Sequence, residues 1–147
     1  MRQFMPVKDA PADTILPKRG TKRSAGYDIY APRDIWVPAH GFSDTIWLNI
    51  KAKMKPYEWL ELRNRSGLMS KHLISLYGSC VIDSDYFGNP SNDGNIGIRF
   101  KNDGDMSYVI KKGERCCQGI FQKYYVTVDD ETLAEERNGG FGSSGRF

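Results

Sequence analysis

The sequence predicts an all-β fold in which many short strands accompany one short helix. Apolar and polar residues alternate in several runs, and this period of two is typical of strands with one buried face. Proline and glycine separate the runs at short spacing, as they do in sandwiches, jelly rolls and barrels. The 147 residues are enough for one domain whose core needs no cross-links.

The strand-like runs are TIWLNIKA (45–52), YEWLELR (57–63), NIGIRFK (95–101) and KYYVTV (123–128). In the first run, we expect Ile46, Leu48, Ile50 and Ala52 to share the buried face. The last run is rich in aromatic and β-branched residues, which favour strands. The helical stretch is short and covers GLMSKHL, Gly67–Leu73.

Charge and cysteine content narrow the class of protein. The net charge of +3 is too small to indicate nucleic-acid binding but suits a small anionic ligand. The cysteines Cys80, Cys116 and Cys117 form a poor disulfide framework and indicate a reducing setting. The two histidines lack zinc spacing, and the N-terminal stretch has no apolar run for a signal peptide or membrane span. We therefore expect a cytoplasmic protein with no membrane partner and no stable nucleic-acid partner.

The stretch VIDSDYFG places two acids, Asp83 and Asp85, two residues apart. In an extended strand both carboxylates would face the same way, with Tyr86 on the other face. Such a pair could activate a water molecule or hold a metal ion. Asp and Gly also suit a tight turn, and the turn is the more ordinary interpretation of this stretch.

Three further stretches carry candidate ligand groups. In RNRSGLMSKH, Arg65, Ser66 and Gly67 could cradle a phosphate, or the serine could simply cap the helix. Gln118 lies among apolar residues in GERCCQGIF and needs a hydrogen-bond partner, either structural or from a ligand. Asp28 in SAGYDIYA is an acid inside a strand, which suits an edge-strand charge or an acid beside a metal ion.

The chain ends in NGGFGSSGRF, residues 138–147, which is rich in glycine. Glycine loses the most conformational entropy on ordering, so such a segment is hard to hold still. The tail is either a disordered remnant or an arm that orders when a ligand binds.

The order of five motifs is more specific than any one of them. AGYDIY, RSGL, VIDSDYFG, GERCCQGIF and RNGGFGSSG follow one another from about Ala25 to Gly145. This series resembles the five motifs of the homotrimeric dUTP diphosphatases (dUTPases). The resemblance implies a distorted β jelly roll over residues 1–136, a homotrimer with shared active sites, and a mobile arm at 137–147 that closes over the site.

The resemblance also implies an activity, the hydrolysis of dUTP to dUMP and pyrophosphate with Mg²⁺. This reaction limits uracil in DNA and supplies dUMP for dTTP synthesis. By motif, Asp83 orients and activates the attacking water, and Tyr86 packs under the deoxyribose and excludes a 2′-OH. Asp28 would hold Mg²⁺ through the water molecules of the ion.

By the same resemblance, the other substrate-binding residues are Arg65, Ser66, Gly67, Tyr77, Cys80, Val81, Ile82, Gln118, Arg137, Phe141, Gly142, Ser143 and Ser144. The hairpin at 77–82 would read uracil through its backbone. The Arg-Ser-Gly triplet would bind the triphosphate of a neighbouring subunit, with Gln118 against the phosphates. In the arm, Phe141 would stack on uracil and the serines would meet the γ-phosphate.

Four features depart from the family pattern. Cys80 stands where the family usually has glycine, and Asn64 replaces a proline before the Arg-Ser-Gly triplet. Arg137 precedes Phe141 by four positions instead of five. NPSNDG, Asn89–Gly94, has the composition of an inserted surface loop. Inserts at this place resemble those of some phage members, which favours a phage or prophage origin.

Three other functions compete with this interpretation. A dCTP deaminase shares the fold but needs a glutamate shortly after the second motif, and SKHLISLYGS has none. A regulatory protein could use the same scaffold with the insert as its partner surface, with or without catalysis. A nucleic-acid-binding β-barrel is the third, and the small net charge argues against it.

Overall fold

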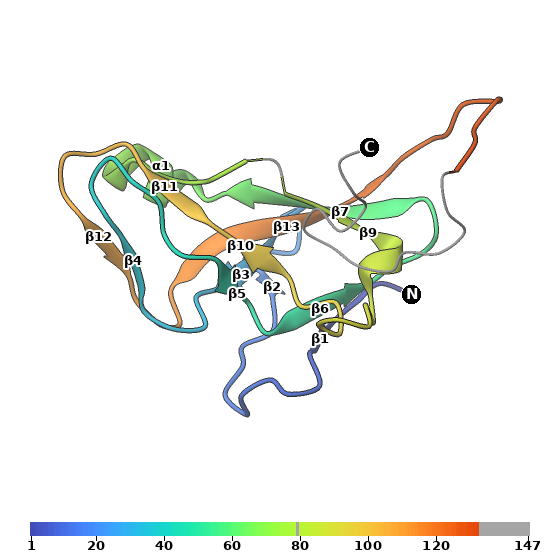
Figure 1. Ribbon diagram of the computed structural model, residues 1–147, viewed down its shortest axis with the longest axis horizontal. Helices are drawn as coiled ribbons and strands as arrows, with labels where there is room; N and C mark the ends of the chain where they lie inside the picture. The colour runs from blue at the N-terminus through green and yellow to red at the C-terminus, as the bar shows by residue number, and fades with distance from the viewer. Residues whose placement is uncertain (79, 133–147) are drawn as a thin grey trace.

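The computed structural model describes residues 1–78 and 80–132, and within them the fold is all-β apart from one α-helix and one 3₁₀ turn (Figure 1). The elements are β1 (Gln3–Pro6), β2 (Lys18–Arg19), β3 (Tyr27–Tyr30), β4 (Ile35–Val37), β5 (Ile46–Trp47), β6 (Ile50–Lys53), β7 (Glu58–Asn64), α1 (Ser66–His72), β8 (Ile74–Leu76), β9 (Cys80–Asp83), η1 (Ser84–Tyr86), β10 (Gly97–Ile98), β11 (Phe100–Asn102), β12 (Tyr108–Ile110) and β13 (Arg115–Lys123). The all-β prediction with one short helix is confirmed.

A five-stranded antiparallel sheet, ordered β2-β3-β13-β7-β9, holds Asp28, Gln118 and the predicted site residues at 80–83. Its central strand β13 is nine residues long and pairs with both β3 and β7. In this register Gln118 lies opposite Asp28 on one side and Arg63 on the other. Antiparallel pairs β1-β6, β5-β10, β8-β11 and β4-β12 complete the described structure.

The predicted alternation of TIWLNIKA gives the core its side chains, although the run is not one strand. Ile46, Leu48, Ile50 and Ala52 are each at most 2% exposed. Between β5 and β6 the backbone of Asn49 takes a left-handed φ of 61°. The burial pattern therefore continues across a kink that composition alone does not signal.

The helix α1 is short and carries no buried residue. It begins after Arg65, whose backbone is extended, and ends at Leu73 in the left-handed region at φ 55°. Lys71 and His72 lie in its last turn, where positive charge is favoured by the helix dipole. The predicted bounds were one residue late at each end. Among the described residues, no helix is long and apolar enough to cross a membrane.

The structure decides one open alternative and overturns one strand prediction. The strand β9 ends at Asp83 and Ser84–Tyr86 forms a 3₁₀ turn, so the turn interpretation of VIDSDYFG is the better one and Asp83 and Asp85 do not share one extended segment. The strand β13 ends at Lys123, and Tyr124–Val128 lies beyond it with mostly exposed side chains. High β-propensity there finds no neighbouring strand among the described residues, and propensity without pairing does not make a strand.

Candidate active site

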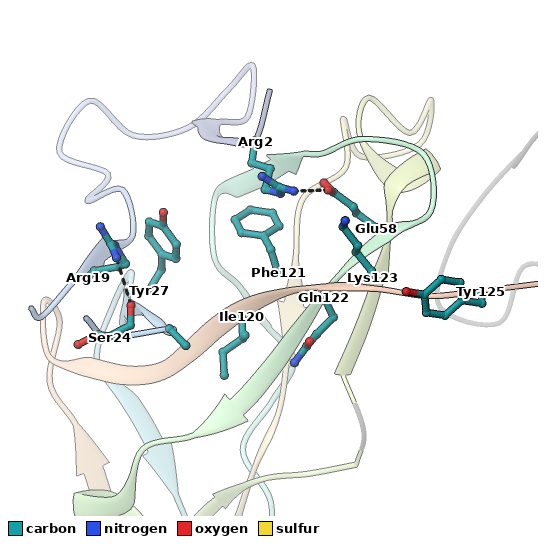
Figure 2. A pocket seen from close by; sticks show the side chains of 11 residues that line it. Arg2, Arg19, Ser24, Tyr27, Glu58, Ile120, Phe121, Gln122, Lys123 and Tyr125 are labelled. Carbon is teal, nitrogen blue, oxygen red and sulfur yellow. Dashed lines mark hydrogen bonds and ion pairs between the residues drawn. The ribbon is translucent and has the colours of Figure 1, made fainter. Parts of the chain in front are cut away.

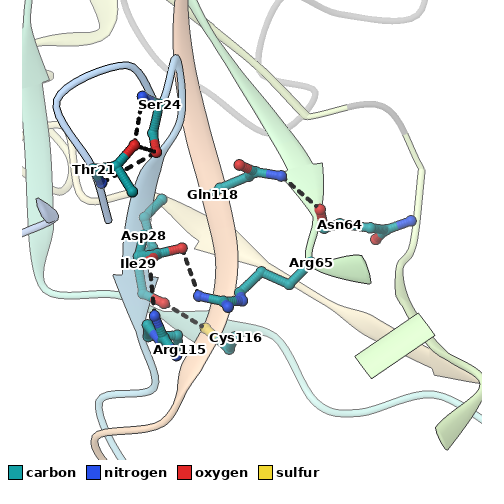
Figure 3. Close-up of polar contacts among 9 residues, drawn as sticks. All are labelled: Thr21, Ser24, Asp28, Ile29, Asn64, Arg65, Arg115, Cys116 and Gln118. Carbon is teal, nitrogen blue, oxygen red and sulfur yellow. Dashed lines mark hydrogen bonds and ion pairs between the residues drawn. The ribbon is translucent and has the colours of Figure 1, made fainter. Parts of the chain in front are cut away.

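Asp28 and Arg65 meet where β3 lies beside the start of α1 (Figure 3). Arg65 Nη1 donates a hydrogen bond to Asp28 Oδ1 at 2.6 Å, and Arg115 Nη1 lies 3.4 Å from Asp28 Oδ2. The Asp28 side chain is 15% exposed, so both arginines are held to a largely buried carboxylate. One negative and two positive charges leave a local excess of one positive charge, which favours an anionic ligand.

A basic hollow of about 580 Å³ opens beside this ion pair. It is lined by Tyr30, Arg65, Gly67, Leu68, Lys71, His72, Tyr108, Gly113, Glu114 and Arg115. A Cβ atom built on Gly67 would meet no atom within 4 Å, so packing within the described residues does not explain this glycine. The helix cap is Arg65 rather than Ser66, so the alternative of a serine cap is wrong.

The Gln118 side chain extends from β13 and lies between the end of β7 and the residue before β3. Its Nε2 donates a hydrogen bond to the Asn64 carbonyl oxygen at 3.0 Å (Figure 3). A Cβ atom on Gly26 would lie 2.2 Å from Gln118 Oε1, which no real contact allows. Glycine at position 26 therefore makes room for the carboxamide.

Asn64 links Gln118 to the segment predicted to read uracil. Its backbone oxygen accepts from Gln118, and its side-chain Oδ1 accepts from the Leu76 backbone N–H at 2.6 Å. A proline at this position lacks the side-chain acceptor that holds Leu76.

The predicted uracil hairpin directs alternate side chains to opposite faces. Val81 is 49% exposed, whereas Ile82 is buried and Cys80 packs against the core. Burial raises the pKa of the Cys80 thiol, which favours the neutral form. The Cys80 side chain thus faces inward, on the same face of β9 as Ile82. The Tyr77 ring packs edge-on against Phe42, with centroids 4.6 Å apart.

Asp83 and Tyr86 lie at the other end of β9. Asp83 is half-buried and lies opposite Trp59 of β7. Tyr86 is 5% exposed, and its hydroxyl donates to the Asn95 carbonyl oxygen and accepts from Asn92 Nδ2.

Asp83 and Arg65 lie toward opposite ends of β7. Trp59, opposite Asp83, precedes Arg65 by six residues, which in an extended chain is about 20 Å. The backbone positions next to Asp83 and Arg65 are thus far apart along one strand of the same chain.

Sequence reasoning missed several residues that the structure adds to the site. Arg115 follows the Gly113 turn and reaches Asp28 only because β13 pairs with β3. Gly26 and Asn92 act through contacts in the folded chain, and nothing in the sequence around them indicates these contacts. The predicted arm residues Arg137, Phe141, Gly142, Ser143 and Ser144 lie outside the described residues.

A second hollow, of about 670 Å³, lies near the N-terminal strand and contains none of the predicted site residues (Figure 2). Arg2 forms an ion pair with the buried Glu58 at its rim. The rings of Tyr27 and Phe121 stack with Phe4 at centroid distances of 5.3 Å. Within residues 1–78 and 80–132, no three His, Cys, Asp or Glu side chains cluster in a way that could hold a metal ion.

The dUTPase family model matches residues 12–145 of the chain. The chain belongs to the dUTPase family. Its sequence is 42% identical over 132 residues to the deoxyuridine 5'-triphosphate nucleotidohydrolase of Lactococcus lactis, covering 88% of this chain and 87% of that protein. This membership decides against the dCTP deaminase alternative.

Solved dUTPase structures share the fold. The dUTPase of Streptococcus mutans superimposes with a TM-score of 0.77 at 34% identity, covering 84% of this chain and 97% of that one. The dUTPase from phage phi11 of S. aureus, described with a structural Mg(II) ion, gives a TM-score of 0.71 at 18% identity over 92% and 98% of the chains. Relatives thus include cellular and phage proteins, and a phage origin of this chain stays a prediction.

Proposed function

We propose that the chain hydrolyses dUTP to dUMP and pyrophosphate in active sites that are each shared between copies of the chain. The nucleotidohydrolase activity follows from family membership at 42% identity over most of the chain. The observation that favours shared sites is the separation of Asp83 and Arg65 along β7, about 20 Å by strand geometry. A homotrimer that brings Asp83 of one copy to Arg65 of another completes the site.

The basic hollow takes the triphosphate. A guanidinium carries five N–H donors, and Asp28 fixes Arg65 without using them all. Gly67 lets a phosphate approach the backbone because no side chain occupies that space. Gln118, whose carboxamide is positioned by Asn64 and Gly26, lies opposite Asp28 in the sheet.

Asp83 orients the attacking water toward the α-phosphorus. Phosphoryl transfer depends on positioning and charge neutralisation more than on covalent chemistry, so one well-placed acceptor suffices. The half-buried position of Asp83 at the end of β9 restricts its motion.

We assign Asp28 to the water molecules of a Mg²⁺ ion, which would neutralise charge on the triphosphate when bound. Mg²⁺ keeps much of its hydration and needs few protein carboxylates, so a single acid suffices. A carboxylate accepts about four hydrogen bonds. Asp28 can therefore hold two arginines and still accept from water.

The segment 77–82 and Tyr86 bind the base and the sugar. The backbone of the Tyr77–Ile82 hairpin pairs with uracil and rejects cytosine by leaving buried polar groups unpaired. Tyr86 forms the wall under the deoxyribose. The C-terminal arm from Arg137 onward closes over the nucleotide and reopens to release product.

Hydrolysis of dUTP, dCTP, dTTP and UTP, each with and without Mg²⁺, tests the proposal. We expect pyrophosphate from dUTP alone, and only with Mg²⁺. Asp83→Asn should keep the fold but lose about 10²–10⁴-fold in turnover. Turnover of that variant within a few-fold of wild type would remove Asp83 from the reaction.

Truncation after Glu136 tests the arm separately. We expect the shortened chain to keep its melting temperature and assembly but lose most of its kcat. Unchanged turnover would make the tail a remnant.

A further inference from the structure

The loop at 89–95, here called the insert loop, holds the hydroxyl of Tyr86. The hydroxyl donates a hydrogen bond to the Asn95 carbonyl oxygen at 2.9 Å and accepts one from Asn92 Nδ2 at 2.7 Å. A tyrosine hydroxyl has one donor and can accept as well, so both capacities are used. Because the two partners lie at different places in the loop, the ring is restrained against both tilt and rotation.

The insert loop also packs on the backbone of Tyr86. A Cβ atom on Gly94 would lie 2.5 Å from the Tyr86 carbonyl oxygen and 3.0 Å from Gly88 N. Gly94 has a left-handed φ of 77°, and its N–H donates to Asn92 Oδ1 at 3.1 Å. The amide of Asn92 thus joins the turn of the loop, through Oδ1, to the Tyr86 hydroxyl, through Nδ2.

The insert loop is anchored to the body of the protein. Asp93 Oδ2 accepts from Lys51 Nζ at 2.6 Å and from the Lys8 backbone N–H at 2.8 Å. Asn95 Oδ1 accepts from the Asn49 backbone N–H at 2.9 Å. These contacts tie the loop to β6, to the kink before it and to the N-terminal segment, so the loop is a fixed support.

We propose that Asn92 is a positioning residue for Tyr86, and that the insert loop thereby determines how strongly UTP is rejected relative to dUTP. The proposal rests on the proposed function, in which Tyr86 forms the wall under the sugar. Asn92 does not touch substrate in this account and acts only through the tyrosine.

The physical reason is the weakness of exclusion by shape alone. An apolar pocket discriminates against an analogue that merely adds a hydroxyl by a factor of only about 10² in kcat/KM. Even this factor requires that the side chain forming the pocket wall stays in place. A ring anchored at its hydroxyl cannot swing away from a 2′-OH. When the anchor is lost, the ring can tilt and admit the ribose.

A double-mutant cycle tests the proposal. The variants are Asn92→Ala, Tyr86→Phe and the pair together, and Ser91→Ala is the matched control. Ser91 is exposed, and among the described residues its side chain and backbone N–H bond Asn89 of the same loop. The readout is the ratio of kcat/KM for UTP to that for dUTP, which a purely structural role would leave unchanged.

We expect Asn92→Ala to raise the UTP:dUTP ratio about 2- to 12-fold, the size of one net hydrogen bond. Tyr86→Phe loses both partners of the hydroxyl and should raise the ratio at least as much. The double variant should match Tyr86→Phe, because the contact that Asn92→Ala breaks is already lost there. Ser91→Ala should leave the ratio at the wild-type value.

An unchanged ratio in Asn92→Ala, or additive effects in the cycle, would overturn the proposal. If Asn92→Ala does not fold, Asn92→Asp takes its place, because it keeps the acceptor for the Gly94 N–H and loses only the Nδ2 donor to the Tyr86 hydroxyl. Tyr86→Ala distinguishes a failure of the Asn92 role from a failure of the proposed function. A changed ratio in Tyr86→Ala with an unchanged one in Asn92→Ala contradicts this inference only, whereas a wild-type chain that does not hydrolyse dUTP contradicts the proposed function.

Discussion

Asp28 and Arg65 form an ion pair of 2.6 Å that joins β3 to the residue before α1 across 37 positions of sequence. We assign Asp28 to the water molecules of Mg²⁺, and the ion pair gives it a second role. It also fixes the Arg65 guanidinium, which we assign to the triphosphate. Arg115 approaches the other oxygen of the same carboxylate, at 3.4 Å. Arg65 and Arg115 are thus organised around one acid.

Asp28→Asn should therefore weaken both functions of the acid. At saturating Mg²⁺ we expect KM for dUTP to rise about tenfold, the effect of weakening a charged hydrogen bond to Arg65. The Mg²⁺ concentration for half-maximal activity should rise as well. Asp34→Asn is the control, since Asp34 pairs with Lys111 in an exposed position. An unaltered KM would show that Arg65 does not depend on Asp28 for its position. An unaltered Mg²⁺ titration would show that Asp28 does not bind the water molecules of the metal ion.

Gly26→Ala should displace Gln118. The new Cβ atom would lie 2.2 Å from Gln118 Oε1, so the carboxamide must leave its contact with Asn64. A misplacement of about 1 Å near reacting groups can cost about 10² in rate, and we expect a loss of that order in kcat/KM for dUTP.

The pair Gly26→Ala and Gln118→Ala provides the control for this clash. Once Gln118 is truncated, the alanine at position 26 has nothing to displace, so the double variant should match Gln118→Ala alone. A further loss in the double variant would show that Gly26 acts through another contact.

Local patterns predicted the buried faces of this protein better than its strand bounds. Ile46, Leu48 and Ile50 are buried as the alternation requires, because one face of a strand must leave water wherever the core lies. The kink at Asn49 and the end of β13 at Lys123 depend on which strands pair, and pairing is set by distant residues.

The candidate site shows the same division. Arg65, Asp28 and Gln118 were predicted from motifs, and the structure brings them together on neighbouring elements. Their supports, Gly26 and Arg115, are defined only by cross-strand register and by close approach in space. The insert was predicted as a surface loop and a partner surface. Much of its polar chemistry faces inward, and its partner role stays a prediction.

The anchor of the insert loop should depend on pH. The hydrogen bond from the Lys51 ammonium lowers the pKa of the Asp93 carboxyl, more strongly than partial burial raises it. A lowered folded-state pKa gives stability that is present above the unfolded value, about 3.9, and is lost as pH falls through the folded value. Asp93→Asn should thus reduce the free energy of unfolding at pH 7, and the difference from wild type should shrink below about pH 4.

Urea unfolding at a series of pH values measures this dependence. Asp9→Asn is the control, because Asp9 is exposed. A difference between wild type and Asp93→Asn that stays constant down to pH 3 would mean that the carboxylate charge does not hold the loop.

The separation of Asp83 from Arg65 leads to a prediction about mixed assemblies. If each site takes Asp83 from one copy and Arg65 from another, a trimer that mixes Asp83→Asn chains with Arg65→Ala chains contains some sites with both residues intact. Each site needs one particular copy to retain Asp83 and a different copy to retain Arg65. Random 1:1 association satisfies both conditions in about a quarter of sites.

We therefore expect co-refolding of these two inactive variants to restore about a quarter of wild-type kcat, since only intact sites contribute. The control mixes Asp83→Asn with Asp83→Ala, and it should stay inactive because every site lacks the same carboxylate. Each variant refolded alone should also stay inactive. Activity that does not rise above the parent variants would place Asp83 and Arg65 in the same chain's site, and the strand β7 would then have to bend enough to bring its two ends together.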